Sequence, residues 1–279
     1  MMPDPLDRSR PGIDRILAVM ARLRDPVHGC PWDVAQTFRT IAPHTIEEAY
    51  EVADAIERGA MDELKEELGD LLFQVVFYSQ MAAETGDFDF EAVSSAIADK
   101  MIRRHPHVFG EDRVDSAAEM TDRWEAQKAA EREAKARSEN RAPSVLDGVI
   151  PGLPALTRAV KLQKRAARVG FDWTEASQIL DKVEEEIDEL RHELAADAPE
   201  RIEDELGDLF FALANLGRRL NVDPEGALRR ANAKFERRFR RIESWLAEAG
   251  RTPDEASLEE MEELWNRAKS EEKAANPAT

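Results

Sequence analysis

The chain has 279 residues, of which 39 are basic and 58 acidic, and its formal net charge is −19. This charge argues against nucleic-acid polymers as partners, because phosphate backbones are held by basic faces. It allows a small phosphorylated ligand, whose charge a metal ion can offset. Cys30 is the single cysteine, and no apolar run approaches the length of a membrane span or of a signal-peptide core. We therefore expect a cytoplasmic protein without a membrane partner.

Apolar residues recur at steps of three and four along the chain. Examples are Leu64, Leu68, Leu71, Leu206, Leu209 and Leu213. Such spacing places the apolar side chains on one face of an α-helix. Strand-like alternation is hard to find, so the sequence predicts an all-α fold.

Two acidic motifs stand in the first half of the chain, TIEEAYE at residues 45–51 and KEELGDLLF at residues 65–73. Their acids of interest are Glu47, Glu48, Glu51, Glu67 and Asp70. Asp70 directly precedes an apolar run, where a merely solvated acid is unexpected. The Thr45-x-x-Glu48 pattern also resembles a capping box, which would give Glu48 a partly structural role.

The same motifs return later in the same order. The two acidic motifs at 45–51 and 65–73 correspond to KVEEEIDE (182–189) and EDELGDLFF (203–211). In the same way, residues 99–105 correspond to AKFERRF (233–239), and residues 119–124 correspond to EMEELW (260–265). In both halves sixteen positions separate the last acid of the first motif, Glu51 or Glu189, from the first acid of ELGD. A repeat in fixed order predicts two halves of one helical design.

A linker separates these halves. Residues 125–139 predict a charged, alanine-rich helix, and residues 140–154 contain three prolines and two glycines. We therefore expect one helical-bundle domain at 1–139, a linker at 140–154 and a second domain at 155–279.

The acids of the second half are spaced to converge. At about 100° per residue, Glu185, Glu186 and Glu189 share one arc of a helix, and Glu205 and Asp208 are neighbours on another. Carboxylates gathered in this way repel one another unless they are protonated, solvated or bound to cations. Oxygen ligands without His or Cys suit Mg²⁺ or, as an alternative, Mn²⁺. A solvated acidic face is the plainer interpretation of each pair, but repetition at identical spacing favours a metal site.

These residues resemble the MazG nucleoside triphosphate pyrophosphohydrolases, whose motif is EExxE followed by ExxD. The resemblance also takes in GCPWD (29–33), RRHPHVFG (103–110), KRAARVGFDW (164–173) and KFERRF (234–239), and so covers nearly the whole chain. It implies two tandem MazG-like helical domains, a homodimer, and Mg²⁺-dependent hydrolysis of nucleoside triphosphates to the monophosphate and pyrophosphate. Such activity is linked to clearing nucleotide pools.

The resemblance and the spacing together predict the site residues. The metal ligands are expected to be Glu186, Glu189, Glu205 and Asp208, with Glu48, Glu51, Glu67 and Asp70 as their counterparts in the first half. Glu185 and Glu186 are the candidate acceptors of the proton of the attacking water. The expected substrate-binding residues are Lys182, Asn232, Lys234, Arg237, Arg238 and Trp265.

The second half is the better equipped for a triphosphate. Lys182 has His44 as its counterpart, and Asn232 has Ala98. Because a triphosphate needs balancing positive charge, we expect the C-terminal half to be catalytic, as it generally is in long MazG-like proteins.

Several alternatives remain open. A di-iron bundle needs a Glu-x-x-His pair on each of two helices, and the acidic sets contain one such pair, Glu189-x-x-His192. A non-catalytic, nucleotide-sensing scaffold is the main rival. Trp265 is either a packed aromatic or, by resemblance, a residue that closes over the nucleoside, whereas Trp32 and Trp173 are expected in the core. The glycines of the two ELGD motifs are expected to admit a neighbouring helix or a ligand.

Overall fold

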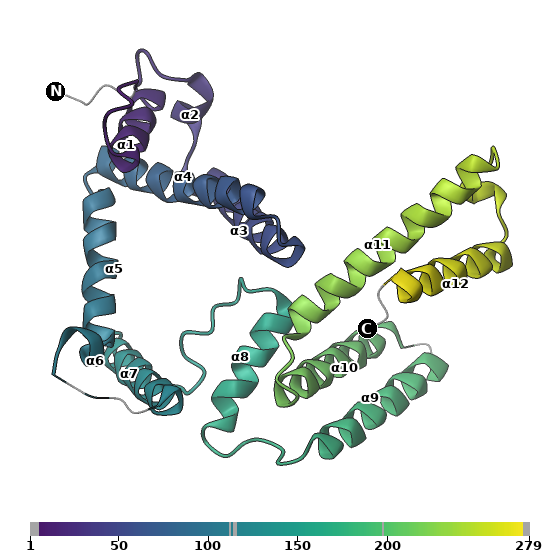
Figure 1. Cartoon of the computed structure of the whole chain (residues 1–279). Helices are drawn as coiled ribbons and strands as arrows, with labels where there is room; N and C mark the ends of the chain where they lie inside the picture. The colour runs from purple at the N-terminus through teal and green to yellow at the C-terminus, as the bar shows by residue number, and fades with distance from the viewer. Residues whose placement is uncertain (1–5, 112, 114–115, 197, 276–279) are drawn as a thin grey trace. The chain divides into compact units, whose positions relative to one another are not determined.

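The computed structural model of the chain describes residues 6–111, 113, 116–196 and 198–275. Every regular element among these residues is a helix (Figure 1), which confirms the predicted all-α fold. The chain divides into two compact units, Met1–Gln127 and Lys128–Thr279. The domain bounds expected from the sequence, with a linker at 140–154, stay a prediction.

The first unit is organised around a pair of long antiparallel helices. Its helices are α1 (Gly12–Leu23), α2 (Pro31–Ala35), α3 (Phe38–Arg58), α4 (Met61–Thr85), α5 (Phe90–Arg104) and α6 (Pro106–Phe109), and α7 (Ala117–Ser138) begins within it. Helix α3 packs against α4, which also contacts α1 and α5. The turn between α3 and α4 is tight because Gly59 adopts a left-handed φ of 68° and Ala60 N donates to Ala55 O at 3.0 Å. This is the hydrogen bond of a Schellman motif.

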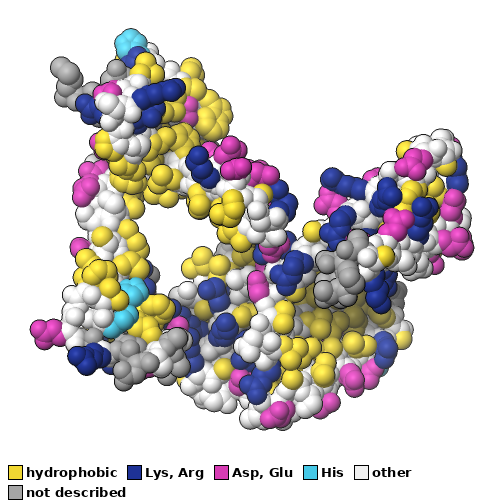
Figure 2. Space-filling model, in the orientation of Figure 1, with side chains coloured by type: hydrophobic (Ala, Val, Ile, Leu, Met, Phe, Trp, Pro, Cys, Tyr) yellow, Lys and Arg dark blue, Asp and Glu magenta, His cyan; other side chains and the backbone are white. Residues whose placement is uncertain are grey.

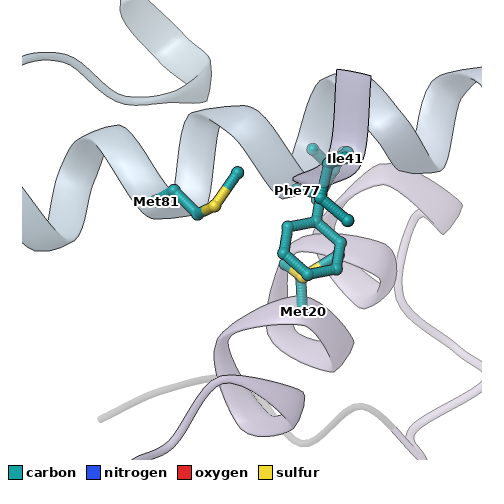
Figure 3. Close-up of a cluster of buried hydrophobic side chains, with 5 residues drawn as sticks. Met20, Ile41, Phe77 and Met81 are labelled. Carbon is teal, nitrogen blue, oxygen red and sulfur yellow. The ribbon is translucent and has the colours of Figure 1, made fainter. Parts of the chain in front are cut away.

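The core of the first unit lies where α1, α3 and α4 meet. Met20, Ile41, Val76, Phe77 and Met81 form this buried cluster, most of which Figure 3 labels. Phe77 and Met81 lie one turn apart on α4 and face the same side. Burying each large apolar side chain contributes about 1.5–3 kcal/mol, so this cluster holds the helices that carry the first acidic set.

The start of α3 differs from the sequence-based expectation. Thr37 caps this helix, since Thr40 N donates to Thr37 Oγ1 at 3.3 Å and Thr37 N donates to Thr40 Oγ1 at 2.8 Å. Thr45 therefore lies inside the helix, where its hydroxyl hydrogen-bonds the Tyr78 hydroxyl at 2.8 Å. The capping box expected at Thr45 is wrong, because an earlier local cap begins the helix.

A buried arginine ties the end of α1 to α4. Arg24 Nε and Nη2 donate to the two carboxylate oxygens of Glu84 at 2.8 and 2.6 Å, and Nη1 donates to Asp33 O at 2.5 Å. The hydrogen bonds from Arg24 hold the pKa of Glu84 below its ordinary value. The ionised form of Glu84 therefore stabilises the folded first unit.

We expect Glu84→Gln to lower the free energy of unfolding by about 1–2 kcal/mol at neutral pH, because a charge-assisted pair is lost. Since the folded-state pKa is lowered, this contribution is present above the ordinary value and is lost as pH falls through the folded-state pKa. Thermal unfolding of wild type and variant at neutral pH and at about pH 3 measures both effects. An equal difference at the two pH values would contradict this account.

The second unit repeats the paired-helix design. Its helices are α8 (Ala155–Ala167), α9 (Ala176–Ala196), α10 (Pro199–Arg219), α11 (Pro224–Glu248), the short 3₁₀ helix η1 (Pro253–Glu255) and α12 (Leu258–Ala275). Helix α10 packs against both α9 and α8, and α11 packs chiefly against α12 (Figure 1). The sequence Asp181-x-x-Glu184 also has the spacing of a capping box, but Asp181 lies inside α9 and so does not begin that helix.

Large apolar side chains remain exposed on both units. Trp32 and Trp173 are 55% and 39% exposed, so the expectation that both are core residues is wrong. On α10, Leu206, Phe210 and Leu213 are exposed, and Figure 2 shows hydrophobic side chains on the surface around this helix. Contiguous patches of this kind are typical of interaction surfaces. None of the described helices has the length and apolar character needed to cross a membrane.

Candidate active site

The acids of the second unit converge where α9 faces α10. Oxygens of Glu186, Glu205 and Asp208 all lie within 4.8 Å of one another. Glu186 comes from α9, and the other two are one turn apart on α10, so the convergence depends on the packing of these two helices. Glu186 is buried, with only 4% of its surface exposed. A carboxylate this deep is costly unless a positive charge or hydrogen bonds compensate it.

Lys182 supplies part of that compensation. Its Nζ lies 2.7 Å from Glu186 Oε1 and 2.8 Å from Glu185 Oε1. Hydrogen bonds to both carboxylates raise the pKa of the Lys182 ammonium, which is therefore charged at neutral pH. The second oxygen of Glu186, Oε2, is buried and has no hydrogen-bond partner among the described residues. This atom is open to a further cationic partner.

Glu205 stands among several other carboxylates of the second unit. Burial raises the pKa of its carboxyl, and the charges of Glu189, Glu186 and Asp208 raise it further. The raised pKa records unbalanced negative charge, which a bound divalent cation would relieve. The donor set consists of carboxylate oxygens, which suit a hard cation. The residues therefore fit a divalent metal ion.

Two of the predicted site acids lie at the margin of the convergent group. Glu189 is not among the three acids that converge within 4.8 Å, although its charge acts on Glu205. Glu185 is exposed and its recorded ion pair is with Lys182. Glu193, which the sequence reasoning missed, is buried one turn beyond Glu189 and also raises the pKa of Glu205. Glu193 follows Glu189 by four residues, and this spacing, which places two side chains on the same face of a helix, could have identified it in the sequence.

The first unit contains the matching arrangement. Oxygens of Glu48, Glu67 and Asp70 lie within 4.8 Å of one another. Burial and the charges of Asp70 and Glu51 raise the pKa of Glu48. No lysine corresponds to Lys182, because His44 occupies its place and its Nδ1 lies 3.5 Å from Glu47. The two units therefore differ at this position: a lysine pairs with two carboxylates in the second unit, and a histidine lies beside one carboxylate in the first.

The glycines between the acids have open surroundings. At both Gly69 and Gly207 a Cβ atom would meet no heavy atom within 4 Å beyond the glycine's own stretch of helix. Among the described residues, therefore, no neighbouring helix approaches closely enough to require a glycine. The alternative, that a ligand approaches there, stays a prediction.

The remaining predicted substrate residues form a separate group on α11 and α12. Arg237 and Arg238 each donate through Nε to Glu272 at 2.8 Å, and the Arg238 guanidinium lies 5.3 Å from the Trp265 ring centre. Trp265 also packs against Phe235, with 5.2 Å between ring centres. Asn232 and Lys234 are exposed on the same helix. Among the described residues, no recorded contact joins this group to the convergent carboxylates.

Glu272 is a second residue that the sequence reasoning missed. It precedes the end of α12 in a run of mixed charges, so its spacing gave no sign of its partners. Its position shows that the two arginines expected to bind phosphates already share one carboxylate. Any anionic ligand at these arginines must compete with Glu272.

Two models of known protein families match this chain, and each covers one of the two acidic sets. The profile of the MazG nucleotide pyrophosphohydrolase domain matches residues 36–109, which include Glu48, Glu67 and Asp70. The profile of phosphoribosyl-ATP pyrophosphohydrolase matches residues 153–235, which include the acids of α9 and α10. The two matches agree with the internal repeat and confirm two tandem MazG-like helical domains.

Curated relatives match nearly the whole chain. The nucleoside triphosphate pyrophosphohydrolase of Escherichia coli K12 is 53% identical over 262 residues, 93% of this chain and 98% of that protein. The nucleoside triphosphate pyrophosphohydrolase/pyrophosphatase MazG of Thermotoga maritima is 42% identical over 92% of this chain and 95% of its own length. The uncharacterized protein YabN of Bacillus subtilis is 43% identical over 92% of this chain, but this match covers 51% of YabN.

Proposed function

The chain belongs to the MazG family of nucleoside triphosphate pyrophosphohydrolases, and we propose that the acids of α9 and α10 form its working site. The enzyme is a hydrolase acting on acid anhydrides, which converts a nucleoside triphosphate to the monophosphate and pyrophosphate. The observation that carries the assignment is the convergence of Glu186, Glu205 and Asp208 beside Lys182.

We propose Mg²⁺ as the metal, with Mn²⁺ as the alternative. Glu186, Glu205 and Asp208 would hold it, with Glu189 as the fourth ligand. When bound, the ion offsets charge on the phosphate oxygens and lowers the pKa of a bound water. The unpartnered Glu186 Oε2 and the raised pKa of Glu205 support a cation here. Neither convergent group among the described residues contains a histidine, which argues against the di-iron rival.

Carboxylates of this chain are proposed to accept the proton that the attacking water releases. A water oxygen attacks the α-phosphorus, the bond from this phosphorus to the oxygen bridging to the β-phosphate breaks, and pyrophosphate leaves. Glu185 or Glu186 accepts the proton that the water gives up. Lys182 holds the Oε1 atom of each, and Oε2 of Glu186 would face the cation, so Oε2 of Glu185 is the better placed of the two to accept the proton.

The polar and aromatic residues of α11 and α12 would bind the rest of the substrate. Lys234, Arg237 and Arg238 are proposed to bind phosphate oxygens and the leaving pyrophosphate, with Asn232 beside them. Glu272 balances both arginines, so a bound triphosphate would replace this carboxylate as their partner. Lys182 contributes a further positive charge from α9.

The quaternary structure is proposed from an exposed apolar face. Leu206, Phe210 and Leu213 leave α10 with uncovered apolar surface. Burial of such surface drives association at about 25 cal/mol per Å², so we propose a homodimer that covers this face. We also propose that the enzyme acts in the cytoplasm on free nucleotides and not on nucleic-acid polymers, in keeping with its net charge of −19.

Product analysis of the full chain tests the proposed reaction. We expect each of a panel of ribo- and deoxyribonucleoside triphosphates, incubated with Mg²⁺, to give monophosphate and pyrophosphate in equal amounts, and chelation of the metal to stop the reaction. Chromatographic separation of mono- and diphosphates measures this. Release of diphosphate and orthophosphate would contradict cleavage at the α-phosphorus. Binding without any product would favour the non-catalytic scaffold, which family membership does not favour.

A further inference from the structure

One ion pair of the second unit joins the two helices that carry the convergent carboxylates. Glu193 stands near the end of α9 and Arg201 in the first turn of α10, and Arg201 Nη1 lies 3.5 Å from Glu193 Oε1. The two partners are unequally buried, because 10% of the Glu193 side chain is exposed and 73% of the Arg201 side chain. The acid of this pair is therefore enclosed by protein, whereas its base stands in solvent.

The pair lies one helical turn from the proposed metal ligands. Glu193 follows Glu189 by four residues on α9, and Arg201 precedes Glu205 by four residues on α10. Residues four apart share one face of a helix. Glu193 is not among the acids whose oxygens converge within 4.8 Å, although its charge is close enough to raise the pKa of the Glu205 carboxyl. It is thus a neighbour of the metal site and not one of its convergent ligands.

The first unit shows that the helix pair does not need an acid at this position. Four residues after the last acid of the first motif, the second unit has Glu193 and the first unit has Ala55, which is buried with 1% of its surface exposed. The counterpart of Arg201 is Glu63, which pairs with Arg58 instead, at 2.5 Å. An apolar residue therefore packs well at this place in the same helical design, and the buried acid is a feature of the second unit.

A buried carboxylate is costly unless a positive charge compensates it. Arg201 compensates Glu193 only in part, because solvent and salt screen an exposed charge. A cation held by the neighbouring carboxylates would meet the charge of Glu193 through protein, where charges interact more strongly than through water. We propose that Glu193 is a positioning residue of the metal site, which strengthens binding of the divalent cation by its charge without touching it. This inference rests on the proposed function for the presence of the cation.

A purely structural role for the ion pair makes a different prediction. If the pair only clamps α9 to α10, loss of either partner loosens the helices and weakens cation binding. If the charge of Glu193 attracts the cation, the two partners act with opposite signs. Loss of Glu193 then weakens cation binding, whereas loss of Arg201 removes a repelling charge and does not weaken it.

The test is a calorimetric titration of the full chain with Mg²⁺. All proteins carry Glu67→Gln, which disables the corresponding acids of the first unit so that the second unit is titrated. We expect Glu193→Gln to weaken Mg²⁺ binding by about tenfold or more, since outer partners of metal ligands typically alter affinity by about 10–100-fold. Arg201→Gln should leave the affinity unchanged or raise it. Asp188→Asn is the matched control, because it removes an exposed, ion-paired acid from the same helix, and it should leave the affinity unchanged.

Two further variants separate charge from shape. Glu193→Asp keeps the charge and should retain most of the affinity. Glu193→Ala copies the residue of the first unit at this position and should weaken Mg²⁺ binding as Glu193→Gln does. It gives a second reading if the unfolding temperature shows that Glu193→Gln is not folded. In steady-state kinetics, the loss in Glu193→Gln should lie in the KM for Mg²⁺ and not in kcat.

Two outcomes would overturn the proposal. One is an unchanged Mg²⁺ affinity in Glu193→Gln and Glu193→Ala, and the other is a similar weakening in Glu193→Gln and Arg201→Gln, which would show a clamp. Failure of the proposed reaction is read separately, from pyrophosphate release by wild type. Pyrophosphate release with an unchanged affinity in Glu193→Gln would refute this inference alone, whereas absence of Mg²⁺ binding by wild type would overturn both.

Discussion

Glu205→Gln should lower pyrophosphate release from nucleoside triphosphates by at least about 10³-fold, the scale of losing a main electrostatic element of phosphoryl transfer. Glu205 is one of the three acids whose oxygens converge within 4.8 Å, and an amide cannot supply its charge to a cation. The fold should remain, because the raised pKa of Glu205 means that its ionised form destabilises the folded state. We therefore expect the unfolding temperature of the variant to equal or exceed that of wild type.

The internal repeat offers a matched control for this experiment. Glu67 belongs to the equivalent convergent group of the first unit, and burial with neighbouring acids likewise raises its pKa. Glu67→Gln should retain activity within about twofold if the second unit is the catalytic one, since the first unit has no counterpart of Lys182. Loss of activity in Glu67→Gln with retention in Glu205→Gln would reverse the assignment.

Arg238→Gln should reduce kcat/KM by about 10²-fold, because a charged donor to the departing pyrophosphate is removed. Arg238 is largely buried, bound to Glu272 at 2.8 Å and placed over the Trp265 ring. Steady-state kinetics with Mg²⁺ and a single nucleoside triphosphate measure the change. Arg240→Gln is the matched control, because Arg240 is exposed on the same helix and pairs with Glu236.

The partner of Arg238 provides a second check on this prediction. Glu272→Gln removes the carboxylate with which a triphosphate would compete, so KM should fall or stay unchanged while kcat is retained. If Arg238 had only a structural role, losing either partner would lower the unfolding temperature without separating kcat from KM. Equal losses of activity in Arg238→Gln and Arg240→Gln would also contradict a direct role.

Much of the architecture followed from local patterns. The step of three and four residues predicted the helices, and the repeated acidic motifs with their accessory blocks predicted the family. Helix starts were less predictable, since Thr45 matched a capping pattern whereas Thr37 begins α3. Several local caps compete along one chain, and neighbouring packing selects among them. The sequence therefore determined the type of element better than its bounds.

Helix period and motif spacing are local properties, so an all-α chain, two acidic sets and membership of the MazG family could be predicted from the residues alone. Tertiary packing brings Glu186, Glu205 and Asp208 together, with Glu189 at the margin. It also decided that Glu272 pairs with Arg238 and that Trp173 borders a cavity instead of lying in the core. Spacing places a side chain on a face of its helix, but the packing of separate helices sets which faces meet.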